Sequence, residues 1–242
     1  MVNRVNQHHL VIGYGEIGQA VAEAIGEYQH VSYLDTNGEQ SRIPEEIHIL
    51  HICFPPSDNF IFDVQDYINE YGPILTIIWS SVPIGTTTKL GTGVIHSPVE
   101  GVHPNLSDSI RAMDRYVGYN TETDAELAQQ LFTDMDIKVK LIPDPRVTEF
   151  LKLRSTSKYG INLVWTQYEA NVMKTMMADY KYVQEYDQSY NRLYEALEMP
   201  QHRRYIMYPP DNHIGGHCVV PNAKLLNEQF PNDMLKMIEE ME

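Results

Sequence analysis

Short apolar runs alternate with segments of helical apolar spacing through the first 143 residues of the chain. The runs lie at residues 9–12, 31–34, 47–54, 74–79 and 93–96, and a further apolar stretch lies at 137–142. After the first run, apolar residues recur at helical spacing from Ala20 to Ile25, which predicts a helix. Strands that alternate with helices form a mostly parallel sheet covered by helices. We therefore expect an α/β domain over residues 1–143.

The remainder of the chain, residues 144–242, has a different pattern. From Val147 to Leu197 there is no proline and a single glycine, Gly160, and the apolar residues keep a helical spacing. Pro143 and Pro145 stand just before this stretch, where prolines are tolerated, and so mark a boundary. We expect a smaller all-helical domain here. Its methionines and tyrosines exceed what so small a domain can bury, which favours a homodimer formed through it over an ordinary amphipathic helix.

The first apolar run leads into a glycine-rich turn. The turn reads Gly13-Tyr14-Gly15-Glu16-Ile17-Gly18. In such a turn the first glycine permits a tight bend, the second lets the backbone approach a pyrophosphate, and the third allows a helix to pack closely on a strand. Asp35 ends the second run, 20 residues after Gly15, where a carboxylate would bind the ribose hydroxyls of a dinucleotide. The sequence therefore predicts a Rossmann-type, doubly wound sheet with a dinucleotide site.

Asp35 also indicates which dinucleotide is bound. A carboxylate at this position repels the extra phosphate of NADP, and the four residues that follow, Thr36 to Glu39, contain no arginine to bind that phosphate. We therefore expect NAD as the cofactor. The alternative is that Asp35 is an ordinary exposed aspartate in a loop.

The charge balance narrows the possible partners. The chain has 33 acidic and 18 basic residues, a formal net charge of −15, which argues against binding to the phosphate backbone of nucleic acids. No run approaches the roughly 20 apolar residues of a membrane helix. The polar start does not resemble a signal peptide, so we expect a cytoplasmic protein without a membrane partner. The two cysteines give no disulfide framework, and Cys53 lies in an apolar run that predicts a core position.

The second cysteine, Cys218, has a different setting. It ends the sequence Gly215-Gly216-His217-Cys218. Glycines let the backbone come close to a ligand, and cysteine is the side chain most readily made into a nucleophile near neutral pH. The alternative is a small buried apolar residue. His213 and His217 flank the thiol, but ligands so crowded, with no distant partner, are a poor zinc pattern, and we expect no metal site.

Four later segments follow one another along the chain. They are Ser80-Ser81-Val82-Pro83-Ile84-Gly85-Thr86-Thr87, Ser97-Pro98-Val99-Glu100-Gly101, Glu149-Phe150-Leu151-Lys152 and the loop that ends at Cys218. Their order resembles that of the UDP-glucose/GDP-mannose dehydrogenase family. With the glycine turn, they extend the resemblance over nearly the whole chain, from Leu10 to about Leu226. The ordered set carries the resemblance, since each motif alone is short.

The resemblance implies an NAD-dependent oxidation of a primary alcohol in two hydride-transfer steps. Cys218 would be the covalent nucleophile, and Lys152 would stabilise the developing alkoxide charge and help to keep the thiol ionised. Glu100 would organise a proton-accepting water, and Thr86 or Thr87 would position that water or the nicotinamide. Beyond the glycine turn and Asp35, the cofactor would contact residues after the third and fourth strands, namely Phe54, Pro55, Ser81, Val82 and Pro83.

The chain departs from the family pattern at several positions. Asn222 and Thr156 stand where the resemblance implies an aspartate and an asparagine, and Val99 stands at the position of a glutamate. An amide cannot accept a proton as a carboxylate does, so release of a thioester would need another base or would be impaired. The chain ends 24 residues after Cys218. We therefore expect a truncated member of the family that lacks the C-terminal nucleotide-binding domain.

Three functions remain open at this stage. The first is a dehydrogenase in which Cys218 forms a covalent adduct with a small-molecule substrate, for which a sugar nucleotide stays open. The second is a two-electron enzyme of the β-hydroxyacid dehydrogenase kind that uses Lys152 and leaves Cys218 non-nucleophilic. The third is a protein that binds NAD without catalysis, which Asn222 and Val99 would suit.

Overall fold

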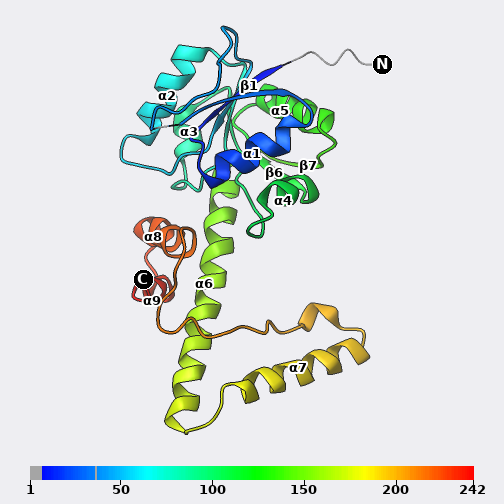
Figure 1. Cartoon of the computed structure of the whole chain (residues 1–242), viewed down its shortest axis with the longest axis vertical. Coiled ribbons are helices and arrows are strands. Elements are labelled where there is room, and N and C mark those ends of the chain that lie inside the picture. Colours follow the sequence, from blue (N-terminus) through cyan, green and yellow to red (C-terminus); the bar gives the residue numbers. More distant parts are fainter. Residues whose placement is uncertain (1–6, 36) are drawn as a thin grey trace. The chain divides into compact units, whose positions relative to one another are not determined.

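The computed structural model describes residues 7–35 and 37–242, and in that part of the chain seven strands form one sheet (Figure 1). The strands are β1 (His8–Ile12), β2 (His30–Leu34), β3 (Ile49–Ile52), β4 (Leu75–Ile78), β5 (Val94–His96), β6 (Arg115–Gly118) and β7 (Val139–Ile142). Their order is β2-β1-β3-β4-β5-β6-β7, and every neighbouring pair is parallel except β5 and β6. The expected α/β fold with a mostly parallel sheet is confirmed.

The helices of the described residues fall into two groups. Those within the first 153 residues are α1 (Glu16–Gly26), α2 (Phe60–Tyr71), α3 (Thr86–Leu90), α4 (Leu106–Ala112) and α5 (Glu122–Asp134). The later ones are α6 (Pro145–Thr175), α7 (Lys181–Ala196), a short 3-10 turn at Pro200–His202, α8 (Val219–Gln229) and α9 (Asp233–Glu239). None of these helices combines the length and the apolar character needed to cross a membrane.

The chain divides into two compact units, Met1–Leu153 and Arg154–Glu242, which we call the sheet unit and the helical unit. The division lies ten residues beyond the boundary expected from the two prolines, because the first turns of α6 belong to the sheet unit.

One strand, β6, has no counterpart among the expected runs. It begins with a charged residue, Arg115, which breaks the apolar pattern on which strand prediction depends.

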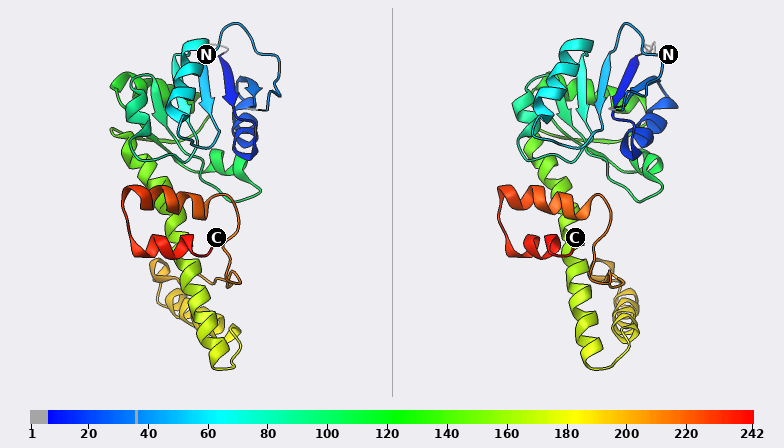
Figure 2. Two further views of the ribbon diagram at one scale, coloured as in Figure 1. Left: turned by 90° about the vertical axis from the view of Figure 1, so that its left-hand side faces the viewer. Right: turned by 60° about the vertical axis from the view of Figure 1, so that its left-hand side comes forward.

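The sheet unit has two separate cores, one on each face of the sheet, and helices lie on both faces (Figure 2). Successive residues of a strand point to opposite faces, so Val11 enters one core while Leu10 and Ile12 enter the other. Helices α1, α4 and α5 cover the first core, and α2 and α3 cover the second. A sheet buried on both faces in this way is the doubly wound arrangement expected from the sequence. Cys53 is buried, as expected.

In the helical unit, α8 and α9 pack closely on α6. A side chain at Gly160 of α6 would place its Cβ 2.8 Å from a methyl group of Val219 and 2.9 Å from one of Ile238, so any larger residue there would require these side chains to shift. Helix α7 differs, because none of its residues is buried. The expected helical character of this part of the chain is therefore present, with an interruption between α6 and α7.

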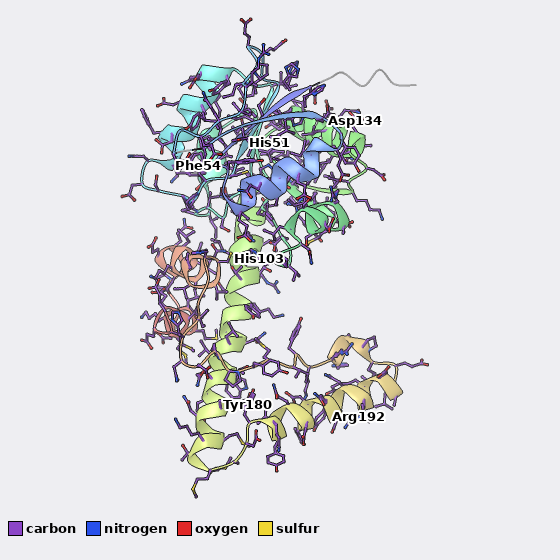
Figure 3. The ribbon with its side chains drawn as sticks, viewed as in Figure 1. His51, Phe54, His103, Asp134, Tyr180 and Arg192 are labelled. Carbon is purple, nitrogen blue, oxygen red and sulfur yellow. The ribbon has the colours of Figure 1, made fainter. Side chains whose placement is uncertain are left out.

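Buried histidines run across the sheet from β1 to β4. The Trp79 indole donates to His51 Nδ1 at 2.9 Å, so His51 carries its proton on Nε2 and donates it to His9 Nδ1 at 2.8 Å. Figure 3 labels His51 among the strands of the sheet. Burial lowers the pKa of His9 to about 3 and lowers the pKa of His51, and burial also lowers the pKa of His96, on β5, to about 3. All three imidazoles are therefore neutral in the folded protein at neutral pH.

Acid should weaken the fold because of these histidines. Each has a folded-state pKa below its ordinary value of 6.5, so below pH 6.5 the unfolded chain binds protons that the folded chain does not. The free energy of unfolding is highest above pH 6.5 and should fall toward pH 3, by up to about 1.4 kcal/mol per pH unit for each histidine. Denaturant unfolding of wild type and of His9→Gln between about pH 7.5 and pH 5 tests this. The variant should show a weaker pH dependence, whereas His30→Gln, at an exposed position, should match wild type. An unchanged pH dependence in His9→Gln would contradict a neutral buried His9.

Candidate active site

The glycine turn joins β1 to α1 where the strand order reverses. Gly13 has a φ of +85°, and a Cβ there would lie 2.9 Å from the backbone nitrogen of Phe54, which follows β3. A Cβ at Gly18 would lie 1.9 Å from the Gly13 carbonyl oxygen, so the helix must approach the turn closely. Nothing lies within 4 Å of the Cβ position of Gly15, which leaves its backbone open to a ligand. The crevice between reversing strands at the carboxyl ends of a parallel sheet is where such folds bind ligands.

Asp35 lies directly against this turn. It follows β2, and its Oδ1 accepts a hydrogen bond from the Tyr14 backbone N–H at 3.1 Å. The Tyr14 ring stacks on Tyr33 with the ring centres 3.7 Å apart. The structure therefore brings together the glycine turn and the acidic residue that the spacing singled out. Thr36, the first of the four residues without an arginine, lies outside the described residues.

Another contact spans the mouth of the turn. Glu16, the first residue of α1, pairs with His103 Nδ1 at 2.5 Å, and both side chains are more than half exposed. His103 belongs to the loop after β5, and Figure 3 labels it at the lower edge of the sheet unit. No sequence pattern predicts this pair, because 87 residues separate its members.

The loop after β4 is fixed by its own hydrogen bonds. The Ser80 hydroxyl donates to the Phe54 carbonyl at 2.6 Å, which ties the loops after β3 and β4 together. The Thr86 hydroxyl donates to the Pro83 carbonyl at 2.7 Å, and Val82 is fully buried. The proton of Thr86 is therefore used within the loop, and its oxygen has only acceptor capacity for a water or a nicotinamide.

Glu149, in the first turns of α6, holds the other side of the same loop. Its carboxylate, in a side chain with no exposed surface, accepts from Gly85 N–H at 2.5 Å, from Thr87 N–H at 2.8 Å and from the Thr87 hydroxyl at 2.7 Å. Burial raises the pKa of Glu149, while the hydrogen bonds from Thr87 and Gly85 lower it. The carboxylate thus occupies the N-terminus of α3, where backbone N–H groups need an acceptor.

Lys152 lies one turn further along α6 and contacts the loop after β5. Its ammonium donates to the Val99 carbonyl at 2.6 Å and lies 3.8 Å from Glu100 Oε2. The Lys152 side chain is 13% exposed and that of Glu100 25% exposed, so the pair is largely shielded but still reachable from solvent. Burial raises the pKa of Glu100, and the charges of Lys152 and Arg115 oppose that rise. The pair places a cation and a proton acceptor side by side.

The thiol loop belongs to the helical unit. Cys218 is the N-cap residue of α8 and is partly exposed, and its side chain makes no capping hydrogen bond. The N-terminus of a helix favours a negative charge, which suits a thiolate. Gly216 has a φ of +92°, which only glycine adopts without strain. Asn222, one turn into α8, is buried and donates from its amide to the Thr156 hydroxyl at 3.0 Å. Two positions at which the chain departs from the expected motifs therefore contact each other.

Comparison with known proteins finds a likeness to a nucleotide-sugar dehydrogenase. No protein-family model matches the chain. UDP-N-acetyl-D-mannosamine dehydrogenase of Methanocaldococcus jannaschii is 22% identical over 216 residues, which cover 79% of this chain and 47% of that protein. The chain thus spans about half the length of the curated relative it matches. The resemblance to nucleotide-sugar dehydrogenases is confirmed.

Solved structures with this fold include the same kind of enzyme. The UDP-N-acetyl-mannosamine dehydrogenase Cap5O from Staphylococcus aureus superposes with a TM-score of 0.73 at 16% identity, over 97% of this chain and 67% of that one. The 3-hydroxyisobutyrate dehydrogenase of Mycobacterium tuberculosis superposes with a TM-score of 0.68 at 12% identity, over 96% of this chain and 91% of that one. These likenesses establish that the chain has the Rossmann-type fold.

The predicted site residues divide between the two units. The sheet unit gathers the glycine turn, the loops after β3, β4 and β5, and Lys152, while Cys218 and Asn222 belong to the helical unit. Sequence reasoning missed what Glu149 does, although the motif contained it, because its partners lie more than 60 residues away. It also missed Arg115, for which the sequence carries no signal.

The Glu149 contacts predict a specific loss of stability. In Glu149→Gln, a single amide oxygen must replace two carboxylate oxygens, and the new NH₂ group faces a backbone N–H. We expect the free energy of unfolding to fall by about 1–3 kcal/mol, measured by urea denaturation. Glu126→Gln, at an exposed position on α5, should change it by less than about 0.5 kcal/mol. Equal effects of the two substitutions would contradict the proposed acceptor role of Glu149.

Proposed function

We propose that the chain is an NAD-dependent oxidoreductase that oxidises an alcohol or aldehyde carbon, in the manner of nucleotide-sugar dehydrogenases. One observation carries the proposal: a single stretch of α6 holds Glu149 on the loop after β4 and Lys152 on the loop after β5, at the edge of the sheet that also carries the glycine turn. An ordinary structural helix start does not need a lysine that pairs with a carboxylate in a partly open position.

The residues around the glycine turn fit NAD. The open backbone at Gly15 and the N-terminus of α1 suit a pyrophosphate, and the Asp35 carboxylate beside Tyr14 suits ribose hydroxyls rather than a phosphate. When bound, NAD supplies the hydride acceptor. Phe54, Pro55 and the segment from Ser81 to Pro83 would line the nicotinamide half of the cofactor, since they follow β3 and β4.

Lys152 and Glu100 would manage charge and protons at the reacting carbon. The Lys152 ammonium would stabilise the oxygen of the substrate as it loses its proton and becomes an alkoxide. Glu100, 3.8 Å away, would take that proton through a water, and the Thr86 oxygen would accept a hydrogen bond from the same water. Lys152 and Thr86 are each held in place by a hydrogen bond to a backbone carbonyl, of Val99 and of Pro83 respectively.

Cys218 would make a four-electron oxidation possible. Its thiolate adds to the carbonyl carbon of an aldehyde, a C–S bond forms, and the carbonyl oxygen takes up a proton. Loss of a hydride and that proton leaves a thioester. Water then breaks the C–S bond and releases the carboxylic acid and the thiol. Asn222 cannot act as the base for this last step, and its buried contact with Thr156 supports a positioning role for its amide.

A two-electron enzyme of the β-hydroxyacid kind is the second candidate. Lys152, Glu100 and the glycine turn all lie in the sheet unit, so a chemistry that needs only these groups would leave Cys218 out. The likeness to 3-hydroxyisobutyrate dehydrogenase, over nearly the whole of both chains, favours keeping this candidate.

The partners follow from the same comparison and from the exposed side chains. We take a sugar nucleotide as the first substrate class to test, because the curated relative is a UDP-N-acetyl-D-mannosamine dehydrogenase. Trp165, Tyr168 and Val172 form an exposed apolar stripe on α6, and α7 buries nothing within the chain. A second copy of the chain would cover these surfaces, which supports a homodimer. The acidic composition and two unpaired cysteines are consistent with a cytoplasmic protein.

The stoichiometry of NADH separates the two candidates. We expect wild type, with NAD and a panel of UDP-N-acetylmannosamine, UDP-glucose and GDP-mannose, to release two NADH for each acid formed. Cys218→Ala should bind NAD with unchanged affinity but form no acid, because no thioester can form. Cys53→Ala, at the other cysteine, should still form acid.

Absorbance at 340 nm and mass spectrometry of the product measure both quantities. One NADH per turnover, with the same rate in Cys218→Ala, would establish the two-electron enzyme instead. No NADH from the panel or from simple hydroxyacids would contradict an enzymatic function.

A further inference from the structure

Arg115 is a charged side chain inside the sheet unit. It is the first residue of β6, only 2% exposed, and among the largest fully buried side chains of the described residues. Burial lowers its pKa to about 10, so the guanidinium still carries its charge at neutral pH. A buried charge is costly unless hydrogen bonds or opposite charges compensate for it.

The side-chain hydrogen bonds of Arg115 go to the loop after β5. Nη2 donates to the Ser97 carbonyl at 3.1 Å and to the Pro98 carbonyl, and the Ser97 hydroxyl lies 3.3 Å away. The next carbonyl, that of Val99, accepts from Lys152 at 2.6 Å. Three successive carbonyls are therefore held by two cations, Arg115 from β6 and Lys152 from α6. Glu100 is the next residue in the chain.

The positive charge of Arg115 is stabilised by the Trp79 ring and by the Glu100 carboxylate. Its guanidinium carbon lies 5.1 Å from the centre of the Trp79 ring, a cation–π arrangement. The charge of Glu100 raises the pKa of Arg115, and the charges of Lys152 and Arg115 lower that of Glu100. His96, the other titratable group on β5 near this cluster, is buried and neutral. The cluster thus contains two positive charges and one negative charge.

We propose that Arg115 is a positioning residue of the reaction site: it orients the loop that carries Glu100 and adds its positive charge to the Glu100–Lys152 pair. This inference rests on the proposed function, in which Glu100 accepts a proton. Burial alone would favour the protonated acid, which cannot accept one. The net positive charge of the cluster also favours an alkoxide over the neutral alcohol.

A structural role alone would make Arg115 a support for the loop with no effect on the protonation of Glu100. Two substitutions separate these possibilities. Arg115→Gln keeps an amide donor for the loop carbonyls and removes the charge. Arg115→Lys keeps the charge and loses the forked donor geometry.

The titration of Glu100 is the decisive measurement, and it needs no substrate. Glutamate labelled with carbon-13 at its carboxyl carbon reports each side-chain pKa by NMR, and Glu100→Gln identifies the Glu100 signal. We expect Arg115→Gln to raise the pKa of Glu100, because one of the two opposing charges is lost, and Arg115→Lys to keep it near the wild-type value. An unchanged Glu100 pKa in folded Arg115→Gln would overturn the proposal.

Hydrogen exchange of Arg115→Lys provides the test if Arg115→Gln does not fold. The amide of Val99 donates to the Trp79 carbonyl at 3.1 Å, so a loosened loop should exchange it at least tenfold faster than in wild type. Unchanged exchange of the amides of residues 99–101 would overturn the orienting role. In an active enzyme, the acid limb of kcat/KM should move to higher pH in Arg115→Gln only. A different outcome is that wild type shows no activity with any substrate tested while the pKa of Glu100 is raised in Arg115→Gln. That result would reject the proposed function and would leave the coupling of Arg115 to Glu100 in place.

Discussion

The buried carboxylate of Glu149 is the contact on which the candidate site depends. It accepts three hydrogen bonds from Gly85 and Thr87 and so fixes the loop after β4 to the beginning of α6. Because Lys152 lies less than one helical turn further along, the same helix start also sets the distance between its ammonium and the loop after β5. One rigid element thereby positions two loops that are separate in the sequence. Precise placement of reacting groups is what a hydride transfer requires of a protein.

Charges that are costly to bury are used to fix backbone at the site. Arg115 and Lys152 donate to three successive carbonyls of the loop after β5, and Glu149 accepts from the backbone of the loop after β4. Arg115 and Glu149 are buried, which strengthens their hydrogen bonds relative to exposed ones. The buried histidines of β1 and β3, His9 and His51, are neutral, so they add no further positive charge to the interior.

The sequence predicts the parts of this structure that depend on local pattern. The parallel strands, the glycine turn and the position of Asp35 follow from periodicity and fixed spacing, and the loops after β3, β4 and β5 follow from ordered motifs. The parts that depend on distant pairing could not be predicted. Arg115 lies in a short strand whose first residue is charged, and its partners are 17 and 18 residues earlier. Asn222 and Thr156 both depart from the expected motifs, and the structure shows that they contact each other. Because 66 residues separate them, neither position alone predicts this contact.

Hydrogen–deuterium exchange of the protein with and without NAD tests most directly whether these loops form a cofactor site. We expect NAD to slow exchange in two peptides, one that contains Gly13 to Gly18 and one that contains Val82 to Thr87, because both follow strands whose carboxyl ends meet at the same edge of the sheet. Peptides from α7 serve as the internal control, since that helix lies in the other unit and none of its residues is buried. Unchanged exchange in the glycine turn at saturating NAD, or protection confined to the helical unit, would contradict a dinucleotide site in the sheet unit.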